Sequence, residues 1–385
     1  MQRRTLLQLF GGIAASGVRS FALQAGRRDR IVIAGAGIIG ANIAYQLAKR
    51  GASVTVFERN KPATGATANS FAWINAQKQP YNYFTLSQTA LGAWHDLHDE
   101  IGRELPVLWG GSVGWTNDPA RVAREAEVVK RYEAWGYPIR AIDGTRLHAL
   151  EPNIVPGAVA TATYNEIEGN ADPVGVTEIV LARAEKSGAQ VKHPVEITGI
   201  DTRDGRLRAV KTTEGDVEAD VLVVACGIDT PRVAAMAGIA VRLTRSPGIL
   251  VHTAPHSRVV DHIVLSPLGQ IKQKANGRIV TGLDFGPAHE EDTTREHGER
   301  FLQRMAAVLP QLQDAQFDKV TLGLRPMPTD GHPVIGFPLG RRDVYITVMH
   351  SGVTLSPLVG RLAAIEILDG IRVDSLEPFR LERFS

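Results

Sequence analysis

The feature that most constrains the fold is a glycine-rich turn near the N-terminus. The uninterrupted apolar run 31–34 predicts a buried strand of a parallel sheet, the turn 35–40 reads Gly-Ala-Gly-Ile-Ile-Gly, and a helix-like pattern follows over 41–50. In such a turn the first glycine makes a tight bend, the second lets the backbone approach a pyrophosphate, and the third lets helix and strand pack closely. The pattern therefore predicts a dinucleotide site opening an α/β fold.

The candidate phosphate-binding residues of this turn are Gly35, Gly37, Ile38, Ile39 and Gly40. A second strand over 53–57 ends in Glu58, whose carboxylate can accept hydrogen bonds from an adenosine ribose and would repel a 2′-phosphate. Arg59 follows as a further candidate contact, and its charge weakens the argument against a 2′-phosphate. The spacing fits FAD and NAD alike, because both contain ADP.

A small, hydroxyl-rich loop, Gly65-Ala66-Thr67-Ala68-Asn69-Ser70, comes shortly after Glu58. Such a loop can wrap the pyrophosphate or the flavin ring of an extended cofactor, which makes Ala66, Thr67 and Ser70 candidate contacts. The alternative is a plain surface loop.

Helices and strands alternate through the rest of the chain. The patterns predict helices over 85–102, 119–135, 173–188, 293–309 and 357–368, strands between 191 and 224 and over 345–349, and a hairpin of 271–275 with 278–282 around Asn-Gly. The hairpin-rich stretch 231–321 differs from the first unit and suggests a second, antiparallel domain inserted into the nucleotide domain.

The first 25 residues have the features of a targeting segment. Arg3 and Arg4 precede a weakly apolar stretch that ends before Arg19 and is too short to cross a bilayer. This order resembles a bacterial twin-arginine export signal, and we expect a periplasmic or exported protein. The alternative is an uncleaved extension on a cytoplasmic protein.

Charge and cysteine content exclude several kinds of protein and of binding site. Six arginines lie within residues 1–30, so the remaining chain is slightly negative although the net charge is +2. Nucleic-acid binding would require clustered positive charge, and none is found there. The single cysteine excludes an internal disulfide and a multi-cysteine metal site, and we expect no metal.

Further motifs lie along the chain in a fixed order. They are Gly169-x-x-Asp172-Pro173, the apolar run 221–225 followed by Cys226-Gly227, Gly323-Leu-Arg325-Pro326, Asp330-Gly331-x-Pro333-x-x-Gly336, and the stretch from His350 to Pro357. With the glycine-rich turn, Glu58 and the 65–70 loop, they resemble the superfamily of FAD-dependent D-amino-acid and glycine oxidases. The resemblance runs from about residue 29 to 368.

The resemblance implies an α/β (α+β) fold, with a glutathione-reductase-like FAD-binding Rossmann domain and an interleaved antiparallel-sheet substrate domain. Residues 29–82, 146–230 and 322–379 would form the FAD domain, and 83–145 and 231–321 the substrate domain.

The resemblance also implies roles for individual residues. Arg325 would bind a substrate carboxylate, and its planar, permanently charged guanidinium suits that task. His350 lies either near the flavin or in a packed, hydrogen-bonded position. Further cofactor contacts would be Val195, on the strand after the Asp172 helix, Cys226, Gly227, Gly352, Val353 and Thr354. The last three lie in the Ser351–Pro357 turn, which would lead into a helix starting near Pro357. The N-terminus of this helix would point at the pyrimidine edge of the flavin.

Departures from the family refine the expectation. Residues 327–329 read Met-Pro-Thr and 65–76 contain no histidine, so the attachment residues used by some relatives are missing and FAD should be non-covalent. The lysine that activates oxygen in sarcosine oxidases would fall near 279–281, where none stands.

We therefore expect a flavoprotein oxidoreductase, an amine or amino-acid oxidase or dehydrogenase acting on CH–N bonds. It would oxidise a D-amino acid, glycine or an N-methyl amino acid by hydride transfer to flavin and imine hydrolysis. Oxygen, or a quinone or other electron carrier, would accept the electrons. The alternatives are an NAD-linked dehydrogenase and a non-catalytic FAD-binding subunit.

Overall fold

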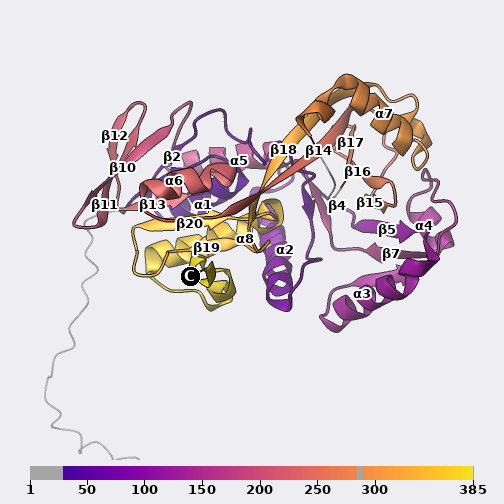
Figure 1. Cartoon of the computed structure of the whole chain (residues 1–385), viewed down its shortest axis with the longest axis horizontal. Coiled ribbons are helices and arrows are strands. Elements are labelled where there is room, and N and C mark those ends of the chain that lie inside the picture. Colours follow the sequence, from indigo (N-terminus) through magenta and orange to yellow (C-terminus); the bar gives the residue numbers. More distant parts are fainter. Residues whose placement is uncertain (1–28, 284–288, 385) are drawn as a thin grey trace, which may run out of the picture.

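The computed structural model describes residues 29–283 and 289–384. The candidate export segment over residues 1–25 lies outside this part of the chain. Two sheets form the two ends of an elongated molecule (Figure 1).

The first sheet has six strands in the order β19-β20-β13-β1-β2-β9. They are β1 (Arg30–Ala34), β2 (Ser53–Phe57), β9 (Gln190–Lys192), β13 (Val221–Val224), β20 (Val344–Val348) and the antiparallel β19 (Val334–Gly336). The side chains of β1 alternate between two cores, with Ile31 and Ile33 in one and Val32 and Ala34 in the other. Burial on both faces explains why these strands are apolar throughout, as the sequence predicts.

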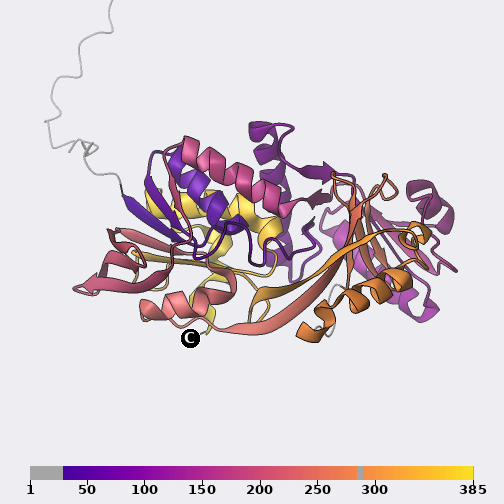
Figure 2. The ribbon, with the colours of Figure 1, turned by 90° about the horizontal axis from the view of Figure 1, so that it is seen from above.

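Three helices cover one face of this sheet: α1 (Ile38–Lys49), α5 (Pro173–Lys186) and α8 (Gly352–Ala364) (Figure 2). A methyl group at Gly360 would lie 2.7 Å from the carbonyl oxygen of Asn42, so α1 and α8 cross closely at a glycine. As predicted, Asp172 precedes α5 and Pro173 is its first residue.

The other face carries α6 (Thr230–Met236) and a three-stranded sheet of β10 (Ile197–Arg203), β11 (Arg206–Thr212) and β12 (Gly215–Glu218). The β10–β11 turn has positive φ at both Asp204 (53°) and Gly205 (74°). Two such residues match the twist of the flanking strands, and the Asp-Gly pair adopts this conformation readily.

The second sheet has eight strands in the order β18-β14-β17-β16-β15-β5-β7-β6. They are β5 (Ser112–Thr116), β6 (Ile139–Ile142), β7 (Thr161–Asn165), β14 (Leu243–Pro255), β15 (Ile263–Ser266), β16 (Gly269–Gln273), β17 (Arg278–Gly282) and β18 (Phe317–Pro328). The predicted hairpin is confirmed as β16 and β17. One face packs on α7 (Arg295–Met305) through Ile271, Val251 and Leu302.

Smaller elements join the two ends. They are the sheet of β3 (Trp73–Ile74), β8 (Gly169–Ala171) and β4 (Val107–Trp109), the helices α2 (Tyr81–Ile101), α3 (Val122–Ala134) and α4 (Gly144–Leu150), a π-helical turn (Ile365–Asp369), and 3-10 turns at 119–121, 227–229, 290–293, 310–312, 374–379 and 381–384.

The sheets divide the chain differently from the ranges proposed above. Strand β7 belongs to the eight-stranded sheet, where it pairs with β5 and β6, although 146–230 was assigned to the FAD domain. Its five residues, Thr-Ala-Thr-Tyr-Asn, carry no signal of which sheet they join, because only long-range pairing decides that. Among the described residues, no helix is both long and apolar enough to cross a membrane.

Candidate functional site

The glycine-rich turn lies between β1 and α1 in the predicted geometry. Gly35 has φ 102°, and a methyl group there would lie 2.6 Å from the carbonyl oxygen of Ala225 at the end of β13. A methyl group at Gly40 would lie 2.0 Å from the carbonyl oxygen of Gly35. Both positions therefore require glycine. The turn brings the first N–H groups of α1 to the carboxyl end of the sheet, where nucleotides bind in such folds.

Glu58 lies beside this turn at the end of β2. Its Oε2 accepts a hydrogen bond from the backbone N–H of Ala36 (3.0 Å), and its Oε1 accepts one from Asn60 (2.9 Å). The carboxylate is thus held at the edge of the nucleotide site. The guanidinium of Arg59 forms an ion pair with Asp229 (2.6 Å) in the turn that follows β13.

The 65–70 loop folds over the glycine-rich turn. The buried Thr67 accepts a hydrogen bond from the N–H of Ile38 (3.1 Å) through its hydroxyl, and Ser70 donates its hydroxyl to the carbonyl of Thr67 (3.2 Å). A methyl group at Gly37 would lie 3.2 Å from that threonine hydroxyl. The loop therefore packs on the glycine-rich turn and does not stand apart from it as a separate surface loop.

Two predicted contacts after β9 and β13 lie near this edge of the sheet. Val195 donates its backbone N–H to the carbonyl of Glu58 (2.8 Å), but it lies between β9 and β10 and not on a strand, which corrects the expectation. Cys226 donates its thiol to the carbonyl of Ala34 (3.3 Å), and burial raises its pKa to about 12, so the thiol is protonated and unreactive. Gly227 continues the same turn with φ 57°.

Helix α8 begins at Gly352, five residues before the predicted start, so Pro357 lies inside the helix. Proline cannot donate to the carbonyl four residues earlier, which is that of Val353. The side chains of Trp94 (3.2 Å) and Ser356 (3.0 Å) donate to this carbonyl instead. Tertiary contacts therefore satisfy the hydrogen bond that made Pro357 look like a helix start.

The first turn of α8 is also tied to β3. The Thr354 hydroxyl donates to the carbonyl of Trp73 (3.2 Å) and accepts from the N–H of Asn75 (3.4 Å). Gly352, Val353 and Thr354 thus lie at a helix N-terminus held next to the segment that follows the 65–70 loop. A helix N-terminus stabilises negative charge in front of it.

Arg325 lies on β18, which approaches the 65–70 loop. A methyl group at Gly323, two residues earlier, would lie 2.7 Å from Cβ of Asn69, so the strand packs directly on this loop. The Arg325 guanidinium donates to the carbonyl of Pro247 (2.6 Å).

The imidazole of His350 is neutral at any working pH. Burial, together with the charges of Lys78 and Arg325, lowers its pKa to about 3.

A buried carboxylate positions the segment between β3 and α2. Glu168 is fully buried and accepts hydrogen bonds from the side chains of Trp73 (2.7 Å), Gln77 (2.9 Å) and Tyr137 (2.5 Å). Burial raises the pKa of this carboxyl group. Lys78, one residue after Gln77, lies on the same segment. The sequence contained no signal for this cluster, because its members are far apart along the chain.

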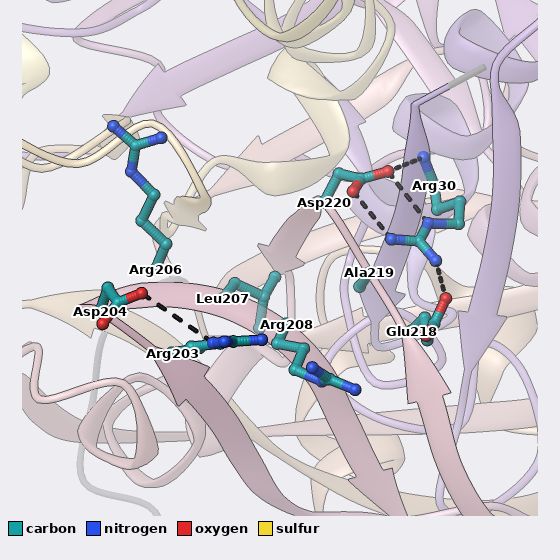
Figure 3. Close-up of a pocket in the computed structure, with 9 residues that line it drawn as sticks. All are labelled: Arg30, Arg203, Asp204, Arg206, Leu207, Arg208, Glu218, Ala219 and Asp220. Atoms are coloured by element: carbon teal, nitrogen blue, oxygen red, sulfur yellow. Dashed lines mark hydrogen bonds and ion pairs between the residues drawn. The ribbon is translucent and has the colours of Figure 1, made fainter. Parts of the chain in front are cut away.

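The described residues contain no cluster of three or more potential metal ligands. A surface groove lies at the other side of the nucleotide domain, lined by Arg30, Arg203, Asp204, Arg206, Leu207, Arg208, Glu218, Ala219 and Asp220 (Figure 3). Arg30 is held there by Asp220 and Glu218. None of the site residues predicted from the sequence lines this groove.

Residues 30–365 match the family model described as FAD dependent oxidoreductase. The chain belongs to this family. Among curated proteins, it is 26% identical to the glycine oxidase of Geobacillus kaustophilus, over 92% of this chain and 97% of that protein. It is also 26% identical to the mitochondrial dimethylglycine dehydrogenase of Mus musculus, over 55% of this chain and 24% of that protein.

Solved structures show the same fold for this FAD-dependent oxidoreductase. The crystal structure of glycine oxidase from Geobacillus kaustophilus matches with a TM-score of 0.84 at 22% identity, covering 92% of this chain and 99% of that one. L-proline dehydrogenase from P. horikoshii matches with a TM-score of 0.81 at 24% identity, covering 93% and 99%. The predicted family, fold class, enzyme class and FAD cofactor are thereby confirmed.

The residues present fit FAD. The glycine-rich turn brings the first N–H groups of α1 to the carboxyl end of the sheet, where a pyrophosphate would lie, and Glu58 is held beside this turn, where a ribose would lie. The first turn of α8 is tied to β3, which follows the 65–70 loop. As a flavoprotein of this family, the chain is an oxidoreductase acting on CH–N bonds of amines or amino acids.

Proposed function

We propose that this enzyme oxidises a small amino acid at its Cα–N bond. The substrate is a D-amino acid, glycine or an N-methyl amino acid, bound with its amine neutral. Bound FAD supplies a hydride acceptor. The substrate loses a hydride from carbon and a proton from nitrogen, and water then converts the imine to a carbonyl product and ammonia or a smaller amine.

The position of Arg325 carries this proposal. Arg325 is on β18, and this strand packs on the 65–70 loop through Gly323 and Asn69. A carboxylate bound by its guanidinium would therefore lie beside the cofactor. Two parallel N–H donors fix both the position and the orientation of a carboxylate. The neutral His350 imidazole, next to Arg325, adds a hydrogen-bonding group without adding charge. Positioning and electrostatics are sufficient, because no protein base is needed once the amine is neutral.

Two alternatives raised by the sequence are set aside. An NAD-linked dehydrogenase does not agree with membership of an FAD-dependent family. A non-catalytic FAD-binding subunit does not agree with relatives whose names denote oxidases and dehydrogenases.

Anaerobic flavin reduction tests the proposed function. The purified holoenzyme is mixed with a panel of amino acids, N-methyl amino acids and plain amines, and the flavin absorbance near ~450 nm is followed. We expect bleaching by at least one carboxylated amine. Flavin that stays oxidised with every member would contradict the proposal. Reoxidation by oxygen, compared with reoxidation by a soluble quinone, then identifies the class of acceptor.

We also propose that the protein is exported with FAD already bound. The Arg3-Arg4 pair and the weakly apolar stretch after it support this. Fractionation of cells expressing the wild type and a variant with both arginines replaced by lysine provides the test. A wild-type protein that is wholly cytoplasmic and keeps its N-terminus would contradict export.

A further inference from the structure

The buried carboxylate of Glu168 holds the segment that contains β3 at three places. Trp73 and Gln77 donate to it directly through their side chains (2.7 and 2.9 Å). The hydroxyl of Tyr137 also donates to it (2.5 Å), and the same hydroxyl accepts the backbone N–H of Ala76 (3.0 Å). Three residues of this segment therefore depend on one carboxylate, two of them directly and one through Tyr137.

Every one of these side-chain partners donates a hydrogen bond to Glu168. The N–H groups of an indole and of an amide can only donate, so a proton on the carboxyl group would have to displace one of the donors. The hydrogen bonds therefore favour the carboxylate, although burial raises the pKa of the group. An amide in place of the carboxylate would direct its own N–H groups at a donor. Because a buried donor without an acceptor is costly, the segment would have to move.

This segment in turn holds the first turn of α8. The Thr354 hydroxyl donates to the carbonyl of Trp73 (3.2 Å) and accepts from the backbone N–H of Asn75 (3.4 Å). Trp73 is also the residue whose indole donates to Glu168. A displacement of the segment is therefore passed through Thr354 to the start of α8.

The start of α8 lies between the glycine-rich turn and Arg325. On one side, a methyl group at Gly352 would lie 3.6 Å from the side chain of Ile39 in that turn. On the other side, His350 comes two residues before α8 and is close enough to Arg325 for its charge to lower the pKa of the imidazole. FAD is an extended cofactor. A flavin that is joined to a pyrophosphate at the turn and faces a substrate at Arg325 would therefore pass the start of α8.

We propose that Glu168 is a positioning residue for the oxidation, and that it fixes the start of α8 against the flavin through the segment that contains β3. This rests on the proposed function and adds to it a residue that acts through others. The N–H groups at the start of a helix stabilise negative charge, and a flavin gains negative charge when it accepts a hydride. A displaced helix start would therefore make the flavin harder to reduce.

The test pairs two variants of this hydrogen-bond network with two matched controls. Glu168→Gln removes the charge, whereas Tyr137→Phe removes a hydroxyl and keeps the carboxylate, so the two variants separate position from charge. Glu151→Gln changes another fully buried carboxylate that accepts several hydrogen bonds, at the end of α4 and far from α8 (Figure 1). Tyr345→Phe removes another buried hydroxyl, which donates to Glu366 in the turn that follows α8 (3.0 Å).

Three quantities are measured on each holoenzyme. Redox dyes give the midpoint potential of the bound flavin, anaerobic mixing with the best amine of the panel gives the limiting rate of flavin reduction, and urea unfolding gives the stability. The potential requires no substrate, so it tests this inference even if no amine reduces the flavin.

We expect Glu168→Gln and Tyr137→Phe to keep FAD, to have a more negative flavin potential and to reduce their flavin about 10- to 100-fold more slowly at saturation. Glu151→Gln and Tyr345→Phe should lose stability but keep the potential, with a limiting rate within about 2-fold of wild type. If Glu168→Gln does not fold, the comparison of Tyr137→Phe with Tyr345→Phe decides.

Three outcomes would overturn the inference. Potentials and rates that match those of the controls would make Glu168 a structural residue. A potential that rises in Glu168→Gln and is unchanged in Tyr137→Phe would mean that the carboxylate acts through its charge. Loss of FAD from Tyr137→Phe would assign the network to cofactor loading. Expected potentials in an enzyme that no amine reduces would instead contradict the proposed function alone.

Discussion

The guanidinium of Arg325 lies directly over Gly248, and a methyl group at Gly248 would come within 2.6 Å of its Nη2 atom. Gly248 pairs with Gly323 across β14 and β18. The missing side chain of Gly248 leaves space for Arg325, and that of Gly323 leaves space for Asn69. On β14, next to Gly248, the carbonyl oxygen of Pro247 accepts a hydrogen bond from the Arg325 guanidinium. The backbone of β14 thus sets where the positive charge is placed.

Gly248→Ala should therefore displace Arg325 without removing it. We expect the half-saturating concentration of a carboxylated substrate to rise about 10-fold or more, because a bidentate contact depends on its geometry. A plain amine should be affected little. Initial rates of flavin reduction with both substrates check this, and unchanged values for the carboxylated substrate would show that Arg325 does not bind it.

Arg325→Lys should be a poor replacement, because an ammonium lacks the planar fork, and Arg325→Ala should be worse. Loss of a charge-assisted bidentate contact costs roughly 2–4 kcal/mol, equivalent to about a 30- to 1000-fold lower rate of flavin reduction at low substrate. FAD content should persist. Equal losses for carboxylated and plain amines, or loss of FAD, would make Arg325 a structural residue.

Acid or heat precipitation should release all flavin as free FAD. The chain has Met327-Pro328-Thr329 after the Arg-Pro pair and no histidine over 65–76, so neither attachment residue is present. Absorbance of the supernatant and of the washed precipitate measures the distribution. Flavin left on the denatured polypeptide would show a covalent bond at another residue.

Gly40→Ala should prevent FAD loading, since its methyl group would lie 2.0 Å from the carbonyl oxygen of Gly35 and force β1 and α1 apart. Gly92→Ala, on α2, is the matched control, because no atom lies within 4 Å of a methyl group there. The ratio of flavin to protein absorbance after purification distinguishes the two variants. A fully loaded Gly40→Ala variant would contradict the close packing described here.

Stability should fall as the pH drops from about 6.5 to 4, in part through His252. Burial, aided by Lys274 and Lys319, lowers its pKa to about 4, and its Nε2 lies 3.0 Å from the Thr321 hydroxyl. In this window the unfolded chain binds a proton at His252 and the folded protein does not, so stability rises with pH by up to about 3 kcal/mol.

His252→Gln keeps a hydrogen-bonding side chain without a titrating group. Its free energy of unfolding should therefore depend less steeply on pH between 6.5 and 4 than that of the wild-type holoenzyme. Urea unfolding at several pH values measures both slopes. Identical slopes would mean that other groups account for the whole acid dependence.

Local patterns predicted the strand, turn and helix around the glycine-rich segment well, because their geometry depends on adjacent residues. The turn has steric requirements at Gly35 and Gly40 that only glycine meets, and these are visible in the six residues 35–40. The hairpin around Asn276-Gly277 was predictable for the same reason.

What escaped prediction depends on partners distant in the chain. Pro357 resembled a helix start because one of the two side chains that replace its missing hydrogen bond, that of Trp94, comes from the distant α2. Lys272 resembles an exposed lysine until the pairing of β16 with β17 and its contact with Ala171 bury it. Glu168 gains its donors only when β3, the segment that follows it and Tyr137, just before β6, come together.

The long strands β14 and β18 run side by side from the cofactor domain to the helix α7, as Figures 1 and 2 show. Each strand therefore contributes to both ends of the molecule, with Arg325 near one end and His252 near the other. No single cut of the polypeptide can separate a complete cofactor domain from a complete substrate domain. One of them therefore cannot be exchanged as a contiguous gene segment, and side chains on β14 and β18 are direct targets for changing specificity.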